Sequence, residues 1–589
     1  MASRTLATMI VLLLVAGAAP ASADPREDLA QLCDEYWQGY LKAHPVSATA
    51  LGDRRYDDQL EDNTPAGTAR EKARLEGVLK RARAIDEKAL DSTRRLDRRA
   101  LIAEIEGQLD QMSCAFDEWA VDPMNGPQTE LVNLSDYTVI ESAQDGQRYV
   151  TRCRAMGRYL DDHVANLGRG LARGRVATRD AVNHTIEQLD GLVAKPVEEW
   201  AMMAPAKVEH ATWSAAARDG FRRDVEGAVR DVVKPAFTRY RDFLAAKVLP
   251  VARPSEKSGI VALDGGLECY RKMIRVHTSL DLSPDNIHKI GLEQVAKFRR
   301  DLAELGGRAL GTTDIAAIQK KLRDDPATHF RTADEVEAKA REALARAEAA
   351  IPKWFGTLPK ARCVVKVMGE HEAPFSTIAY YRQPAVDGSR PGTYMINTYK
   401  PETRPRYEAE ALAWHEAIPG HHLQIAIAQE LTGLPEFRKH QGPTAFVEGW
   451  ALYTERLADE MGLYSGDLDR IGMLSFDAWR ACRLVVDTGM HAKGWSRQQA
   501  IDYMMENSVL AENNVVNEVD RYIAWPGQAL AYKLGQLEIL KLRDEGRKRL
   551  GTRFDIKTFH DVVLRNGAVA LPVLRDQVEA YYAQVEGAK

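Results

Sequence analysis

Apolar residues recur every three or four positions from Arg26 to about Pro250, which is the spacing of amphipathic helices. RRALIAEIEGQLDQM and RDAVNHTIEQLDGLVAKPVEEW keep this spacing over several turns. Little in this region alternates apolar and polar residues as a strand does. We therefore expect residues 26–250 to fold as helices.

A change in composition divides the chain near residue 250. LPVARPSEKSG, residues 249–259, gathers proline and polar residues, which is typical of a domain boundary. Helical spacing then resumes between Ser283, a good N-cap, and Gly306, a good stop. The length of 589 residues is enough for two lobes. We expect a signal peptide over residues 1–23, a helical N-terminal lobe over 24–250 and a catalytic lobe over 251–589.

The pattern becomes strand-like at Arg362. RCVVKVMG and GTYMINTY are rich in β-branched and aromatic residues, and DGSRPG between them supplies turn residues. These segments predict a small sheet in a mainly α fold. GTYMINTY is expected at an edge, where an extended peptide substrate would add as a strand beside Tyr394 and Asn397.

The stretch WHEAIPGHHLQ follows the predicted sheet and resembles an interrupted zinc-protease helix. In the usual H-E-x-x-H motif two histidines lie one turn apart with a glutamate between them. Here His415 and Glu416 are followed by Pro419, which lacks an amide donor and must bulge, kink or restart the helix. A π-type bulge of two extra residues would bring His421 beside His415, and three would bring His422. We favour His421 as the second ligand and keep His422 as the alternative.

A third ligand is expected from the helix predicted over residues 442–462. Zinc in catalytic sites takes three protein ligands and leaves one position for water. Glu448 is surrounded by apolar residues, where a carboxylate needs a paired charge or a metal. Glu455, two turns later on the same face, is expected to orient a ligand. The sequence therefore predicts a Zn²⁺ site, with Glu416 as the general base.

NEVDRYIAWPGQALAYKLG, residues 517–535, supplies polar groups for substrate. Tyr522 or Tyr532 is a candidate donor to the oxyanion that forms during amide hydrolysis. Arg521 and Lys533 are candidates to bind a substrate carboxylate. A second His-Glu pair, His371-Glu372, precedes a proline outside any predicted helix, and we interpret it as loop.

The N-terminus predicts export. Arg4, the apolar run from Met9 to Ala16 and the small residues ending at Ala23 form a secretory signal peptide, with cleavage before Asp24. The run is shorter than the roughly 20 residues that cross a bilayer, and no cysteine follows the cleavage site to carry a lipid. We expect a periplasmic or secreted protein without a membrane anchor.

Charge and cysteine content narrow the function further. A net charge of −5 argues against nucleic acid or an anionic membrane as the main partner. The six cysteines include no C-x-x-C pair, so a cysteine-ligated zinc is not expected. Disulfides are expected in an exported chain, with Cys114–Cys153 as the first hypothesis. The sequence contains no G-x-S-x-G elbow, so a serine hydrolase is not expected.

HEAIPGHHLQ, FVEGWALYTERL, GTYMIN and RYIAWPGQALAYKLG together resemble the bacterial "domain of unknown function 885" family. The resemblance covers most of the mature chain and implies a link to gluzincin metallopeptidases, which hold zinc by two histidines and a downstream glutamate. It also implies a two-lobed helical metallopeptidase fold with a small sheet beside a deep cleft.

These observations favour an exported zinc metallopeptidase that hydrolyses short peptides. One alternative is a zinc-dependent amidase acting on a non-peptide or modified amino-acid substrate, because a fold and a metal do not define the substrate. Another is a non-catalytic helical binding protein. Glu416 distinguishes these hypotheses, since a binding protein has no need of a glutamate beside the first ligand.

Overall fold

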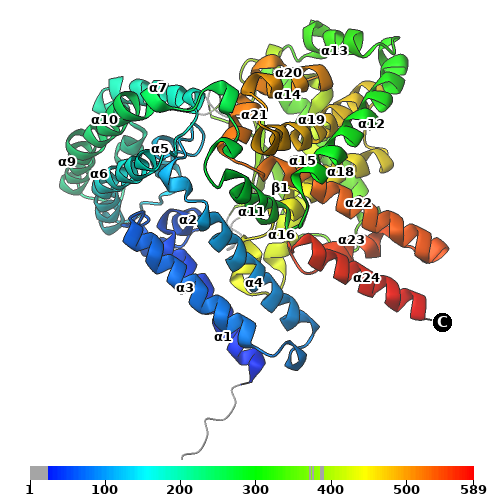
Figure 1. Cartoon of the computed structure of the whole chain (residues 1–589), viewed down its shortest axis with the longest axis horizontal. Helices are drawn as coiled ribbons and strands as arrows, with labels where there is room; N and C mark the ends of the chain where they lie inside the picture. Colours follow the sequence, from blue (N-terminus) through cyan, green and yellow to red (C-terminus); the bar gives the residue numbers. More distant parts are fainter. Residues whose placement is uncertain (1–23, 370–372, 374–376, 385–389, 589) are drawn as a thin grey trace, which may run out of the picture.

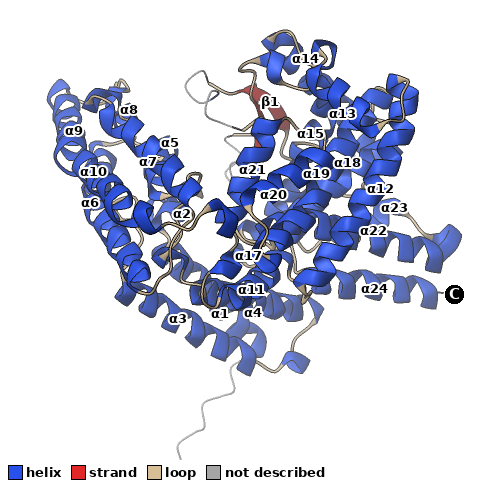
Figure 2. Ribbon diagram, turned by 45° about the horizontal axis from the view of Figure 1, so that its top comes forward, coloured by secondary structure: helices blue, strands red, loops and turns tan. Residues whose placement is uncertain are grey.

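A computed structural model describes residues 24–369, 373, 377–384 and 390–588. They form a mainly helical molecule with a three-stranded sheet, which confirms the predicted mixture of elements (Figure 1 and Figure 2). The predicted signal peptide and the pair His371-Glu372 lie outside the described residues.

The N-terminal helices surround two hydrophobic cores. The first core is built by α1 (Pro25–Ala43), α2 (Pro45–Ala50), α3 (Pro65–Ala84) and α4 (Ser92–Ser113), together with Phe437 from a later helix. The second is built mainly by α5 (Pro127–Tyr137), α6 (Ala143–Ala172), α7 (Arg179–Ala194), α8 (Ala204–Lys207), α9 (Ala215–Ala228) and α10 (Lys234–Phe243). Figure 1 shows these helices grouped on one side of the molecule.

The largest core follows the predicted boundary. Its helices are α12 (Pro284–Leu310), α13 (Ile315–Asp324), α14 (Ala333–Ala350), α15 (Ala409–Glu416), α16 (His421–Glu430), α18 (Thr444–Glu460), α19 (Asp467–Lys493), α20 (Arg497–Asn507), α21 (Glu512–Ala524), α22 (Ala531–Leu550), α23 (Ile556–Leu564) and α24 (Leu571–Gly587). Helix α11 (Gly266–Thr278) belongs to a smaller neighbouring core, and the short α17 (Glu436–His440) carries Phe437 into the first core.

Helix α19 is the centre of this core. Every residue from Ile471 to His491 is buried, and α12 packs along the helix. Beside it, α18 crosses α22 closely, because a Cβ on Gly449 would lie only 2.5 Å from the backbone of Gly535. None of the described helices combines the length and hydrophobicity that a bilayer crossing requires.

The sheet contains β1 (Cys363–Val367), β2 (Ala379–Arg382) and β3 (Gly392–Ile396) in the order β1-β3-β2. β3 pairs in parallel with β1 and antiparallel with β2. The expectation that GTYMINTY forms a sheet edge is therefore wrong, because β3 is central and bonded on both sides. β2 was missed although its AYYR stretch is rich in aromatic residues.

One disulfide joins Cys114, at the end of α4, to Cys269 in α11. The expected Cys114–Cys153 pairing is wrong because Cys153 is free and buried in the core of α5 to α10, whereas α4 packs against α11. Cys33, Cys363 and Cys482 are also free and buried. The bridge links the first group of helices to the segment after residue 250.

Candidate metal centre

The motif helix is interrupted at the predicted proline-glycine step. Helix α15 ends at Glu416, the Ile418-Pro419 peptide bond is cis, and α16 begins at His421. The interruption differs from the expected π-type bulge, because the chain leaves helical geometry at Ala417 and at Gly420. Two separate helices therefore present the two histidines.

Close packing holds this interruption in place. A Cβ on Gly420 would lie 1.9 Å from the carbonyl oxygen of His415, so only glycine lets the chain fold back over the end of α15. The indole Nε1 of Trp450 donates a hydrogen bond of 3.0 Å to the carbonyl of Pro419. Thr454 donates one of 3.1 Å to the carbonyl of Trp414. Helix α18 thus holds the end of α15 and the turn that leads into α16.

His415, His421 and Glu448 converge from α15, α16 and α18. Glu448 Oε2 lies 3.6 Å from His415 Nε2 and 3.5 Å from His421 Nε2. One ligand atom from each residue lies within 4.8 Å of the other two. Both histidines are buried, while the Glu448 side chain keeps 20% of its surface exposed, so the cluster is open to solvent on one side.

The spacing within the cluster fits a shared cation. Nitrogen to oxygen distances of 3.5 and 3.6 Å exceed the roughly 2.7–3.2 Å of an ordinary N–H···O hydrogen bond. Two ligand atoms on a tetrahedral zinc with bonds of roughly 2.1 Å are separated by about 3.4 Å. Two imidazoles and one carboxylate are also the ligand set of several zinc hydrolases. The residues present therefore fit Zn²⁺.

The charge around the cluster favours a cation. Glu455 Oε1 lies 2.7 Å from His415 Nδ1, so this carboxylate orients the ring as predicted. Burial lowers the pKa of His415, but Glu448 and Glu455 outweigh it and raise this pKa to about 9. Burial also raises the pKa of Glu416 above its usual value. Three carboxylates thus surround two imidazoles.

His422 points away from the cluster. Its Nδ1 lies 2.9 Å from the hydroxyl of Tyr381, and its Nε2 lies 3.0 Å from the carbonyl of Ala361. Burial lowers the pKa of His422 to about 4, so the ring is neutral, with Nε2 donating to the carbonyl and Nδ1 accepting from the hydroxyl. Between the two histidines left open by the sequence, the geometry selects His421, and His422 instead joins α16 to the sheet.

The predicted substrate residues have different surroundings. Tyr394 is buried in β3, where burial and the charge of Glu416 raise its pKa. The amide of Asn397 donates to the carbonyls of Ala373 and Thr377, so we no longer assign it to substrate. Lys533 is buried and bonded to Asp477 at 2.5 Å, and its predicted carboxylate-binding role is withdrawn for the same reason.

The remaining predicted residues gather around one arginine. The hydroxyl of Tyr522 is buried and accepts hydrogen bonds from Trp479 and Arg483, so we no longer assign it to the oxyanion. Tyr532 lies with its ring centroid 4.3 Å from the same guanidinium and stays a candidate donor. Arg521 donates to Gln528 and lies 3.6 Å from Glu518, so it is partly engaged within the protein.

Sequence reasoning overlooked Arg480 and Arg483, the arginines at the middle of α19. Asp477, Arg480, Arg483 and Asp487 recur at three- and four-residue spacing in an otherwise apolar helix. Buried charges on one side of a buried helix are unusual, and this stripe was the available signal.

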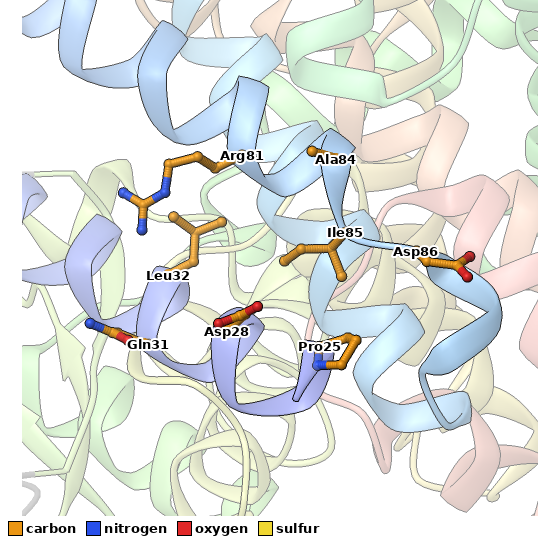
Figure 3. A pocket seen from close by; sticks show the side chains of 8 residues that line it. All are labelled: Pro25, Asp28, Gln31, Leu32, Arg81, Ala84, Ile85 and Asp86. Carbon is orange, nitrogen blue, oxygen red and sulfur yellow. The ribbon is translucent and has the colours of Figure 1, made fainter. Parts of the chain in front are cut away.

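A hollow of about 400 Å³ lies between α1 and α3, remote in sequence from the metal cluster. Its lining, drawn in Figure 3, is Pro25, Asp28, Gln31, Leu32, Arg81, Ala84, Ile85 and Asp86. Arg81, its basic residue, is already paired with Glu35 at 2.7 Å. We assign this hollow no role.

The model of a bacterial family described as "Bacterial protein of unknown function (DUF885)" matches residues 45–578. No curated protein matches the chain. The crystal structure of a presumed lipoprotein from Colwellia psychrerythraea is 29% identical and has a TM-score of 0.89, over 95% of this chain and 100% of that chain. A presumed lipoprotein of unknown function from Shewanella oneidensis is 20% identical, with a TM-score of 0.73 over 93% of this chain and 99% of that chain. The second likeness shows the fold alone.

Proposed function

Because the chain belongs to the bacterial DUF885 family, whose description gives no function, we propose from the site itself that it is an exported zinc-dependent metallopeptidase of gluzincin type. The observation that carries this proposal is the spacing of Glu448 Oε2 from two imidazole nitrogens, 3.5 and 3.6 Å. These separations suit ligands of one ion better than hydrogen-bonded partners.

His415, His421 and Glu448 would hold the ion. Bound zinc supplies a Lewis acid that polarises a carbonyl and makes a water molecule acidic near neutral pH. Glu416 directly follows the first ligand, and burial raises its pKa toward the range of an effective general base. Its carboxylate takes a proton from the attacking water and passes it to the leaving amine.

Other side chains prepare the site for this proton transfer. Glu455 fixes the ring of His415 by a contact of 2.7 Å, so that Nε2 faces Glu448. Burial and the charge of Glu416 raise the pKa of Tyr394, so its hydroxyl stays protonated. Tyr532, whose ring lies beside the arginines of α19, is the donor to an oxyanion that we propose, because the hydroxyl of Tyr522 already accepts from Arg483.

Export has support from the sequence and from one neighbour. The predicted signal peptide ends at Ala23, and the Colwellia structure is that of a presumed lipoprotein, a class of exported protein. The substrate we propose is a short peptide outside the cytoplasm, in the periplasm or the medium.

The adjacent histidines provide a matched test. We would prepare His421→Gln and His422→Gln, load both with zinc, remove excess ion and measure bound zinc and digestion of a peptide library by mass spectrometry. We expect His421→Gln to lose zinc and all cleavage, and His422→Gln to keep zinc. Equal zinc in both variants, or cleavage that survives a chelator in the unmutated protein, would overturn the proposal.

A further inference from the structure

Two arginines on successive turns of α19 lie against the same aromatic rings. The guanidinium carbons of Arg480 and Arg483 lie 4.1 and 4.5 Å from the ring centroid of Trp479. They lie 5.7 and 4.3 Å from that of Tyr532. Both arginines are at most 5% exposed. A guanidinium stacked on a ring by its face keeps its edge N–H groups free for a planar acceptor.

Arg480 lacks the partner that a buried charge normally has. Its Nε and Nη1 atoms are buried without a hydrogen-bond partner, and within the described residues it forms no ion pair. Arg456 and Lys533 nearby show the usual arrangement, since both bind Asp477. A buried, unpaired guanidinium is unfavourable unless something else satisfies its donors.

Arg483 adds a further free donor to the same place. Its Nε donates to Tyr522 at 2.8 Å and its Nη2 to Glu518 at 2.9 Å, which leaves Nη1 buried without a partner. Glu518 also faces Arg521 at 3.6 Å. Among the described residues, Arg483 and Arg521 thus share this one carboxylate and Arg480 has none, so the three arginines keep an excess of positive charge.

The helix that carries this excess charge adjoins the helices of the metal cluster. Helix α19, which carries both arginines, packs against α15 and α18, the helices of His415 and Glu448. Among the residues that the structure describes, Arg480 forms no ion pair with a carboxylate of these helices, and its Nε and Nη1 donors have no partner.

We propose that Arg480 and Arg483 form the binding site for a carboxylate of the substrate, next to the scissile bond. A carboxylate presents two oxygens in one plane, which matches the edge of a stacked guanidinium. A bound carboxylate also neutralises part of the excess positive charge of the arginines. The carboxylate is either the C-terminus of a short peptide or an acidic side chain. This inference rests on the proposed peptidase function and defines its substrate class.

The test measures binding in a protein that does not turn over. Zinc-loaded Glu416→Gln protein is titrated calorimetrically with the tripeptide Ala-Ala-Ala as free acid, with its C-terminal amide and with the amide of Ala-Asp-Ala. We expect the free acid or the acidic amide to bind about tenfold or more tightly than the neutral amide, as charge-assisted hydrogen bonds predict. Whichever of the two binds tightly identifies the source of the carboxylate.

Arg480→Gln in the same background should bind all three peptides with the affinity of the neutral amide. Arg308→Gln, on the surface of α12, should leave the preference intact. Equal binding of the three peptides by the parent protein would overturn the inference while leaving zinc-dependent cleavage in place. If Arg480→Gln does not fold, the comparison in the parent protein decides. A protein that binds none of the peptides and cleaves none in its unmutated form would overturn both proposals.

Discussion

Glu455 Oε1, on α18, lies 2.7 Å from His415 Nδ1, on α15, and both side chains are buried. The contact uses Nδ1 of the ring and leaves Nε2 toward Glu448 and His421. Glu455 therefore sets the orientation of the proposed first ligand without belonging to the ligand set.

Replacing this carboxylate should weaken metal binding. We expect Glu455→Gln to lower zinc affinity about 10- to 100-fold, because the ring of His415 loses its orienting carboxylate and some basicity. Competition with a chromophoric chelator measures this. Glu460→Gln, on the same helix but bonded to Arg543, is the control and should keep parental affinity. Equal affinities in the two variants would refute the orienting role.

Glu416 should be required for turnover but not for zinc. Glu416→Gln keeps the shape of the side chain and removes the proton acceptor, so kcat should fall about 10²- to 10⁴-fold with KM nearly unchanged. Steady-state kinetics beside zinc analysis checks both expectations. Parental turnover in a zinc-loaded variant would rule Glu416 out as the general base.

Gly420 should be essential to the interruption between α15 and α16. In Gly420→Ala the new Cβ meets backbone rather than a flexible side chain, and we expect a loss of at least about 2 kcal/mol in the free energy of unfolding. Urea denaturation of the metal-free protein measures it. Gly77→Ala, at an exposed position of α3 with open space around it, should instead raise the free energy of unfolding by about 0.5–1 kcal/mol. Similar stability of both variants would contradict the packing described here.

Asp487 should make stability depend on pH. Burial raises its pKa from 3.8 to about 7, and its carboxyl accepts from Tyr270 and from the amide of Gly527. Between these pH values the folded state retains a proton that the unfolded state releases, so the stability contributed by Asp487 falls as pH rises.

The matched variant isolates this effect. Asp487→Asn carries no titrating proton at this position. Relative to this variant, the free energy of unfolding of the unmutated protein should fall by on the order of 1–3 kcal/mol between pH 4 and pH 7. Urea denaturation of both metal-free proteins across this range measures the difference. A constant difference in stability would show that Asp487 does not titrate there.

The helical pattern made most of the fold predictable. Ser283 caps a helix as expected, although α12 continues past Gly306 to Leu310, because Gly306 packs tightly against Ile318 rather than ending the helix. The sheet was predicted in part, since β2 is only four residues long. Strand order and the disulfide depend on contacts distant in sequence, which local patterns do not encode.

The candidate site was predictable where chemistry and spacing coincide. His415, Glu416 and Glu448 stand out by residue type, and Pro419 indicated the interruption between the two histidines. The sequence left His421 and His422 open because the direction of each ring depends on the turn between α15 and α16. Arg480 was overlooked because it stands out only by its missing hydrogen-bond partners, which a sequence does not show.

The central claim is that His415, His421 and Glu448 bind one zinc ion. Anomalous diffraction from crystals of the purified protein, collected on both sides of the zinc absorption edge, tests it most directly. The account predicts one peak roughly 2.0–2.2 Å from His415 Nε2, His421 Nε2 and Glu448 Oε2. A zinc-supplemented crystal without a peak among these atoms, or with its zinc bound elsewhere, would contradict the account.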